Sequence, residues 1–211
     1  MGNKKMTALL LCGGKSTRMG VDKQKLSYNG VYLIDTIIEN LAKNFDQIII
    51  LSNEKNFFEN RYKNYKNDIL IKEDIIKNIG PCAGLYSGLI YAKNEDNFLI
   101  ACDMPYFNQA YIDFLKEKSY EKILAYKNEK YFEPFFALYK KELAKDLEKY
   151  IKNGGRSLNG FLRAISPTVI KKEEIKEIKN VEKIFRNLNY PKDWKKFIEE
   201  SKNEFSQKIP N

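Results

Sequence analysis

The chain has 211 residues, of which 43% are hydrophobic and 31% are charged, and its 37 Lys and Arg against 28 Asp and Glu give a formal net charge of +9. This composition is typical of one ordinary soluble domain. The chain contains no histidine, which excludes Ser-His-Asp and Cys-His catalysis, a His general base and His-ligated zinc. Carboxylates, lysine, arginine and backbone amides remain as the available chemistry, and we expect any metal to be a hard ion such as Mg²⁺.

The cysteines and the N-terminal segment indicate in which cellular compartment the protein is expected. Cys12, Cys82 and Cys102 are odd in number and lack a C-x-x-C spacing, so we interpret them as packing residues in a reducing cytoplasm. The apolar stretch at residues 8–12 is too short for a signal-peptide core or a membrane span. The sequence therefore predicts a cytoplasmic protein without a membrane partner.

The positive charge is spread along the whole chain. Lysines alternate with acidic residues, as they do over residues 171–177, which indicates a solvated mixed-charge surface. Nucleic acid, which requires basic residues clustered on one face, is therefore not an expected partner. A moderate positive field still favours a small polyanionic substrate.

The first predicted elements alternate between strand and helix. Residues 6–12 form a continuous apolar run that ends at glycines, as a buried parallel strand does. Residues 34–41 carry apolar side chains at the i, i+3, i+4 and i+7 spacing of an amphipathic helix. Further buried strands are expected over residues 47–52 and 69–71.

The alternation continues after Gly80. Pro81 is pre-organised for a first helical turn, so we expect a helix over residues 83–91. The remaining expected elements are a strand over 97–102, a helix over 108–118, two strands over 122–127 and 131–139 that could form a hairpin, and a helix over 143–151 that is stopped by Gly154-Gly155. This order predicts an α/β fold, a single three-layer α/β/α domain with a mostly parallel central sheet. We expect the domain to span residues 1–200 and to be followed by a polar tail over 201–211.

Polar or glycine-containing segments follow four of the expected parallel strands. They are residues 13–25, 52–53, 73–74 and 103–105. Ligands of such folds bind at the carboxyl ends of the strands, so these segments predict one shared binding rim.

The segment after the first strand has the largest number of residues that could contact a ligand. Gly13-Gly14 would let the backbone approach a ligand closely, and Arg18 and Lys23 are cations suited to a triphosphate. A Walker P-loop is excluded because Leu9 stands where that motif needs a glycine, and a Rossmann glycine motif is excluded because Lys15 occupies the second glycine position. From these residues alone, a solvated basic loop stays an alternative.

This loop and four later segments resemble the molybdenum cofactor guanylyltransferases. Residues 11–23 are similar to that family's pattern, L-x-G-G-x-S-x-R-M-G-x-D-K. The later segments match the family's motifs in the same order, and they are residues 73–74 with 80–85, 101–106, 133–139 and 185–193. The resemblance implies a Rossmann-like nucleotidyltransferase fold of the glycosyltransferase-A-like type.

The resemblance also implies roles for individual residues. The implied nucleotide-binding residues are Leu11, Cys12, Gly13, Gly14, Lys23, Asn53, Asp74 and Asp103. Asp103 would hold Mg²⁺, and Lys23 and Arg18 would neutralise charge on the phosphates during catalysis. The implied acceptor-binding residues are Pro134, Asn187 and Asn189, with the two asparagines facing a pterin.

The reaction implied by the resemblance is transfer of GMP from GTP to molybdopterin bearing molybdenum, with release of pyrophosphate. The expected partners are these two substrates, and molybdopterin-handling proteins and molybdoenzyme chaperones are further candidates. One alternative is a cytidylyltransferase or a sugar- or terpenoid-phosphate nucleotidyltransferase of the same fold. Another is a non-catalytic basic nucleotide-binding module, which would not need an acidic residue at Asp103.

Overall fold

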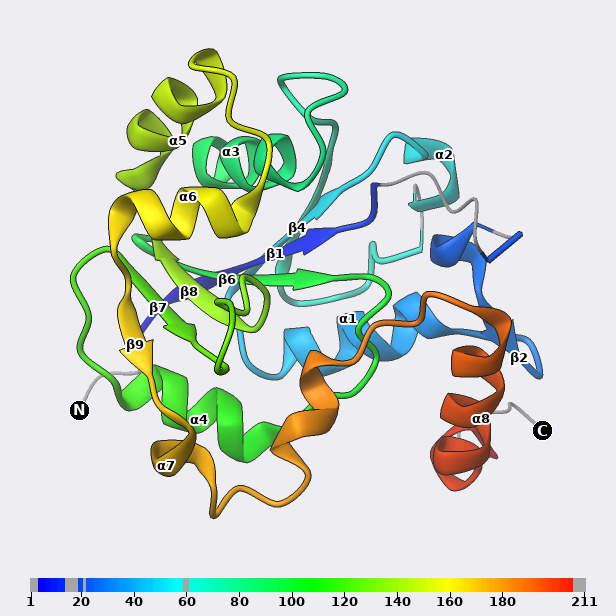
Figure 1. Cartoon of the computed structure of the whole chain (residues 1–211). Coiled ribbons are helices and arrows are strands. Elements are labelled where there is room, and N and C mark those ends of the chain that lie inside the picture. The colour runs from blue at the N-terminus through cyan, green and yellow to red at the C-terminus, as the bar shows by residue number, and fades with distance from the viewer. Residues whose placement is uncertain (1–3, 14–18, 21, 59–60, 207–211) are drawn as a thin grey trace.

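The computed structural model describes residues 4–13, 19–20, 22–58 and 61–206. Its centre is a seven-stranded sheet in the order β5-β4-β1-β6-β8-β7-β9 (Figure 1). The strands are β1 (Met6–Leu11), β4 (Gln47–Leu51), β5 (Asp68–Lys72), β6 (Asp96–Ala101), β7 (Ile123–Tyr126), β8 (Ala137–Lys140) and β9 (Thr168–Ile170). Only β8 pairs antiparallel with its neighbours, β6 and β7. The predicted mostly parallel α/β sheet is therefore confirmed.

Helices cover both faces of this sheet (Figure 1). The helices are η1 (Lys23–Lys25), α1 (Leu33–Ala42), α2 (Lys55–Phe58), α3 (Pro81–Tyr91), α4 (Gln109–Glu117), α5 (Leu143–Lys152), α6 (Leu158–Ile165), α7 (Lys172–Ile175), η2 (Val181–Phe185) and α8 (Pro191–Ser206). A separate antiparallel pair, β2 (Ser27–Tyr28) and β3 (Val31–Tyr32), precedes α1. Within the described residues, no helix has both the length and the apolar character that a membrane crossing requires.

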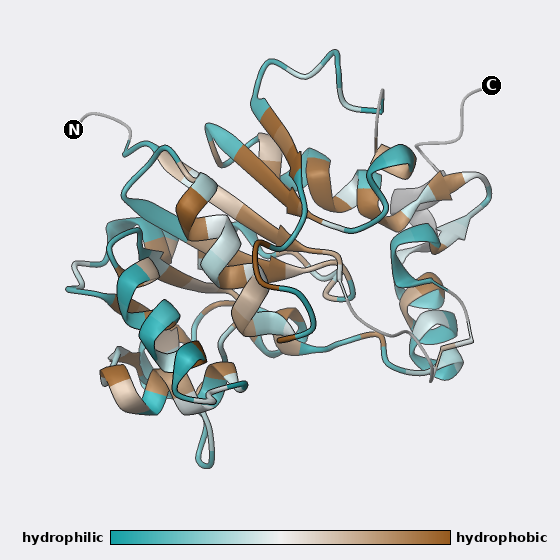
Figure 2. Cartoon of the chain, turned by 90° about the horizontal axis from the view of Figure 1, so that it is seen from above, coloured by the Kyte–Doolittle hydropathy of each residue, from teal (hydrophilic) through white to brown (hydrophobic). Residues whose placement is uncertain are grey.

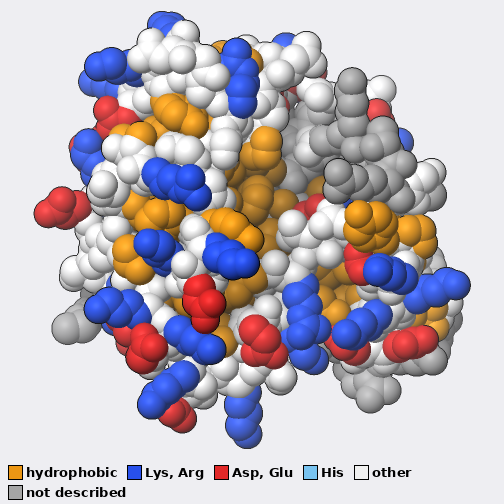
Figure 3. All heavy atoms as spheres, viewed as in Figure 1, with side chains coloured by type: hydrophobic (Ala, Val, Ile, Leu, Met, Phe, Trp, Pro, Cys, Tyr) orange, Lys and Arg blue, Asp and Glu red, His pale blue; other side chains and the backbone are white. Residues whose placement is uncertain are grey.

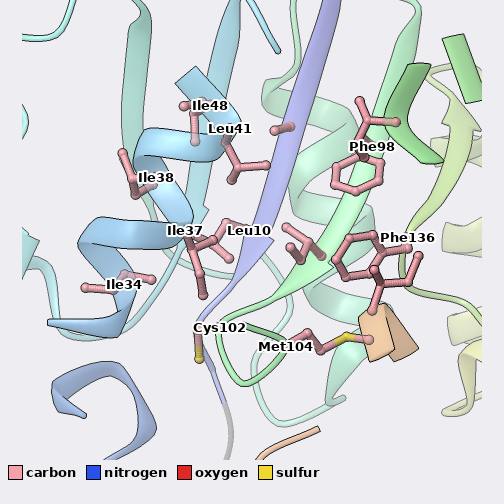
Figure 4. Close-up of a cluster of buried hydrophobic side chains, with 14 of the residues drawn as sticks. Leu10, Ile34, Ile37, Ile38, Leu41, Ile48, Phe98, Cys102, Met104 and Phe136 are labelled. Carbon is pink, nitrogen blue, oxygen red and sulfur yellow. The ribbon is translucent and has the colours of Figure 1, made fainter. Parts of the chain in front are cut away.

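The period-two pattern of β1 divides the core into two layers. Ala8 and Leu10 pack with α1 and α4, whereas Leu9 and Leu11 pack with α3, α5 and α6 on the opposite face. Figure 4 shows the first layer, in which Ile37 of α1 lies beside Leu10 of β1 and Phe98 lies on the other side of that strand. In Figure 2 the central strands are mostly hydrophobic, whereas the surrounding helices carry both hydrophobic and hydrophilic residues. The three-layer α/β/α arrangement follows from these two cores.

Two glycines allow α3 to lie unusually close to β1. A Cβ atom at Gly84 would come within 2.8 Å of Leu11 Cγ, and one at Gly88 would come within 2.8 Å of Leu9 Cδ1. Glycine is therefore needed at both positions for this helix–strand distance. As a result, the start of α3 at Pro81 lies near the carboxyl end of β1.

Most of the expected elements are present with small shifts at their ends, and the hairpin of β7 and β8 is confirmed. The strand expected over residues 131–139 is wrong in its first half, because β8 begins at Ala137. Two residues explain the difference: Pro134 has no N–H to donate, and Phe136 has a left-handed backbone with φ of 52°.

The sequence patterns gave no element after Gly155, yet α6, β9, α7, η2 and α8 follow it. Ser157 is the N-cap of α6, since its side chain accepts a hydrogen bond from the Gly160 N–H. Helix α8 crosses the expected tail boundary and ends at Ser206, and Ser201 is buried. The division of the chain at residue 200 stays a prediction.

Candidate functional site

The four polar segments predicted to share a rim follow adjacent strands. In the parallel register Leu11 lies beside Leu51 and Ala101, and Leu51 lies beside Lys72. The ladder continues past the strand ends, because Cys12 N donates to Leu51 O at 2.9 Å and Cys102 N donates to Leu11 O at 3.0 Å. The backbone at the start of each polar segment is therefore fixed by the sheet itself.

Three predicted site residues from distant parts of the chain meet at this rim. The Lys23 ammonium lies 2.7 Å from Asp103 Oδ2 and donates a second hydrogen bond to Asn189 Oδ1 at 3.0 Å. The side chains of Lys23 and Asp103 are 18% and 17% exposed, so the pair is open to a ligand while being shielded from most of the solvent. The ammonium can pair with a phosphate, whereas the carboxylate would repel a phosphate unless a cation lay between them.

The backbone around Asn189 explains how it reaches Lys23. Leu188 is buried, and its N–H donates to the Asp103 carbonyl at 2.8 Å. The Asp193 carboxylate accepts from the Asn189 and Tyr190 N–H groups at 3.0 and 2.8 Å, which caps the start of α8. Asn187, which was predicted to accompany Asn189, is exposed. The structure therefore brings Asn189 to Lys23 and leaves Asn187 on the surface.

Asp22 and Gln24, the second of which the sequence reasoning missed, fix the loop that carries Lys23. Asp22 is the N-cap of η1 and accepts from Gln24 N at 3.1 Å, and the Gln24 side chain is buried. Gln24 Oε1 accepts from Ser52 Oγ at 2.5 Å, which ties η1 to the end of β4. Asp22 therefore fixes the loop that carries Lys23. The sequence could not predict that this glutamine is buried, because a single glutamine in a polar segment forms no recognisable pattern.

The end of β5 carries a different set of charges. Lys77 donates to Glu73 Oε2 at 2.6 Å and to Asn53 Oδ1 at 3.3 Å, so two predicted rim segments are bridged by one ammonium. Its hydrogen bond holds the pKa of the Glu73 carboxyl below the ordinary value. In contrast, burial raises the pKa of Asp74, the partly buried carboxyl beside it. Asp74 is thus a weakly solvated carboxyl at the rim.

The cysteines at the rim are structural. Cys12 and Cys102 are buried free thiols that follow the neighbouring strands β1 and β6, and Cys82 is buried in α3. Burial is the main cause that raises the pKa of Cys12, and a hydrogen bond with Cys102 adds to it. A protonated, enclosed thiol is a poor nucleophile. The interpretation of the cysteines as packing residues is confirmed.

Pro134 lies at the same edge of the sheet on the far side of β6. Its carbonyl accepts from Tyr139 Oη at 2.7 Å, and Phe136 N donates to Leu99 O at 2.8 Å. Beside it lies Glu133, a half-buried carboxyl that the sequence reasoning missed, which accepts from Asn128 Nδ2 at 3.0 Å. Burial raises the pKa of Glu133. This segment therefore adds a second weakly solvated carboxyl to the rim.

Several predicted site residues are not brought into this cluster. Gly14 and Arg18 lie outside the described residues. Leu11 and Cys12 are buried at the end of β1, and Gly13 is exposed just beyond them. Within the described ranges, no group of three or more Cys, Asp and Glu side chains is arranged to hold a metal. A metal ion held by Asp103 would therefore need phosphate or water oxygens to complete its coordination.

Known proteins share both the sequence and the fold of this chain. The family model described as MobA-like NTP transferase domain matches residues 8–168. A protein of Peptoclostridium acidaminophilum named "Probable molybdenum cofactor guanylyltransferase" is 32% identical, and the alignment covers 94% of this chain and 90% of that protein.

Two solved structures share the fold at low sequence identity. The molybdopterin-guanine dinucleotide biosynthesis protein A from Archaeoglobus fulgidus has a TM-score of 0.75 at 23% identity, covering 94% of this chain and 99% of the other. The inositol-1-phosphate CTP transferase from T. maritima has a TM-score of 0.70 at 14% identity, covering 100% and 99%. The fold is therefore common to enzymes named for different substrates, and the sequence match decides the family. This chain belongs to the MobA-like NTP transferase family.

Proposed function

We propose that this nucleotidyltransferase transfers GMP from GTP to molybdopterin bearing molybdenum, forming the guanine dinucleotide cofactor and pyrophosphate. The observation that carries the proposal is the meeting of Lys23, Asp103 and Asn189 at the rim of the sheet. The name of the relative from Peptoclostridium acidaminophilum supports guanylyl transfer to the molybdenum cofactor. A nucleotide-binding module without catalysis would not need an acidic residue at Asp103.

The chain needs no nucleophile of its own for this reaction. The terminal phosphate of the acceptor is already an anion, so it attacks the α-phosphate of GTP directly and pyrophosphate leaves. The protein has to orient the two phosphates and stabilise the charge that moves onto the leaving group. Lys23 supplies a fixed positive charge for this purpose, and Asp103 and Asn189 hold its ammonium in position.

Asp103 is also the residue that would hold Mg²⁺. Its carboxylate is a hard oxygen donor, and it lies at the rim beside the Lys23 ammonium. When bound, the ion would act as a Lewis acid on the phosphate oxygens. Removal of divalent ions is therefore expected to stop transfer while the fold persists.

We assign base recognition to the part of the rim at the ends of β5, β4, β1 and β6, which we call the nucleotide side. Asp74 is a partly buried carboxyl after β5, and its carboxylate could accept from the N–H donors of guanine. A cytosine ring offers a different donor pattern, so the same residue distinguishes GTP from CTP.

The buried free thiols are typical of a reducing compartment, and we therefore place the reaction in the cytoplasm.

A thermal-shift series with GTP, CTP and ATP, each with Mg²⁺, tests the nucleotide assignment. GTP is expected to stabilise the protein by about 2.7 kcal/mol at 100 times its Kd, and CTP and ATP by much less. Asp74→Asn should reduce the difference between GTP and CTP, whereas Asp113→Asn, an exposed carboxylate on α4, should leave it unchanged. Stronger stabilisation by CTP would shift the assignment to the cytidylyltransferase alternative.

A further inference from the structure

A hollow lies at the carboxyl ends of two other strands of the sheet, and neither Lys23 nor Asp103 lines it. It has a volume of about 640 Å³ and lies at the carboxyl ends of β7 and the edge strand β9. We call it the β9 surface, and it is lined by Tyr126, Lys127, Asn128, Glu129, Lys130, Tyr131, Val169, Lys171, Lys172 and Glu173. Because β7 and β9 run in the same direction as β6, this surface opens at the same carboxyl ends of the parallel strands as the reaction site.

The charge of the β9 surface is positive. Its four lysines, 127, 130, 171 and 172, are all exposed, and two exposed glutamates oppose them. Within the part of the chain that the structure describes, none of these lysines forms an ion pair. The nearby Glu174 is engaged elsewhere, since it bonds to Lys118 at 2.7 Å and accepts from the Lys171 N–H at 2.8 Å. The surface is therefore complementary to a ligand with several negative charges.

Apolar side chains lie among these lysines. Tyr131 is 50% exposed and Val169 is 37% exposed, and they are two of the five large hydrophobic residues that are exposed in the described structure. Figure 3 shows basic side chains, with acidic ones among them, beside hydrophobic side chains over the region of β7, β9 and α7. A small polyanion would leave Tyr131 and Val169 in water, whereas a protein segment would cover them.

The backbone of β9 offers hydrogen bonds to such a segment. Lys127 N donates to Ile170 O at 3.2 Å, so the peptide groups of Ile170 face β7. Successive residues of a strand turn their N–H and C=O to opposite sides, so those of Val169 face the open edge. The turn after β7, which lines the same hollow, is also fixed, because Asn128 Oδ1 accepts from the Lys130 and Tyr131 N–H groups at 2.9 Å each. Little ordering of the chain is needed before a strand can be added there.

We propose that the β9 surface binds an extended acidic segment of a partner protein, which adds as a strand beside β9. Acidic side chains on the segment meet the four lysines, and its apolar side chains cover Tyr131 and Val169. That the partner supplies the acceptor or receives the dinucleotide product rests on the proposed function, whereas the binding itself does not.

Fluorescence anisotropy with a labelled peptide of about ten residues, in which Glu and Val alternate, tests this proposal. The double charge reversal K171E/K172E should weaken binding at least ~10-fold. The matched control K145E/K149E reverses two exposed lysines of α5 and should bind the peptide like the wild type. Val169→Pro removes the outward N–H without removing the bond to Ile170 O, and should weaken binding about fivefold. GMP transfer to free molybdopterin should be unchanged in all three variants, which separates this test from the proposed function.

Three results would overturn the proposal. The first is equal peptide affinity of K171E/K172E and K145E/K149E. The second is displacement of the peptide by tripolyphosphate at matched charge, with no effect of Val169→Pro, which would indicate a site for small polyanions. The third is binding of an oligothymidylate to the same lysines more tightly than the peptide, which would indicate a nucleic-acid surface.

Discussion

The two sides of the rim that we propose as catalytic, the nucleotide side and the acceptor side, are built differently. On the nucleotide side, β5, β4, β1 and β6 are all parallel, and each polar segment follows its strand directly. On the acceptor side, β8 runs the opposite way, and Asn189 comes from a segment 166 residues after Lys23 in the sequence. The nucleotide side is therefore positioned by local chain direction, whereas the acceptor side is positioned by long-range contacts.

This difference identifies Lys23 and Asp103 as the point where the two sides join. Asp103 follows β6 on the nucleotide side, and its carbonyl accepts from Leu188, which brings the acceptor-side segment to the rim. Substitutions at the junction should affect both substrates, and substitutions beyond it should affect one.

The largest expected effect is that of Asp103→Asn. This variant keeps the shape of the side chain but removes the charge that holds Lys23 and would hold the metal, so GMP transfer should fall by at least ~100-fold. Pyrophosphate release measures the loss, and circular dichroism should show an intact fold. Asp113→Asn is the control, and a wild-type rate in Asp103→Asn would contradict the assigned role.

Lys23→Ala should lower transfer by one to two decades, because it removes a charged hydrogen bond to phosphate worth about 1.5 to 3 kcal/mol. Since Lys23 lies at the junction, both the Kd for GTP and the KM for the acceptor should rise. Lys25→Ala removes a neighbouring lysine that is 46% exposed and pairs with Glu54. Equal rates for these two variants would assign Lys23 to the solvated surface.

Asn189→Ala is expected to have a smaller and more selective effect. It removes one neutral acceptor from the Lys23 ammonium, worth about 1 kcal/mol, so transfer should fall about fivefold with GTP binding nearly unchanged. Asn187→Ala provides the comparison, because Asn187 is exposed and should change only the KM for the acceptor. A kcat as low in Asn187→Ala as in Asn189→Ala would show that the contact with Lys23 has no special part.

The smallest effect concerns the stability of the acceptor side. Burial raises the pKa of Glu133, so the folded state holds this proton more tightly than the unfolded state does. The contribution to stability is then present at pH values below the ordinary value of 4.5 and is lost as the pH rises through the higher folded pKa. Glu133→Gln should remove this pH-dependent loss of stability. The urea midpoints measured below pH 4.5 and above the folded pKa should therefore differ less in this variant than in the wild type. An unchanged pH dependence would contradict the assignment.

The sequence allowed more to be predicted on one side of the rim than on the other. Apolar runs followed by polar segments identify β1, β4, β5 and β6, because a strand and the loop after it are neighbours in sequence. The contact between Lys23 and Asn189 could not be derived in this way, since it depends on how Leu188 docks on Asp103. Only the resemblance to a family pointed to Asn189. Short elements such as β9, with three residues, carry too little periodicity to be predicted.

The most direct test of the central claim follows the label from GTP marked at its α-phosphate to molybdopterin bearing molybdenum. The wild-type protein should form a labelled guanine dinucleotide and unlabelled pyrophosphate, and chelation of divalent ions should stop the reaction. Labelled CTP should give little product under the same conditions. Faster transfer from CTP, or undiminished transfer in the presence of a chelator, would contradict guanylyl transfer at the site of Lys23, Asp103 and Asn189.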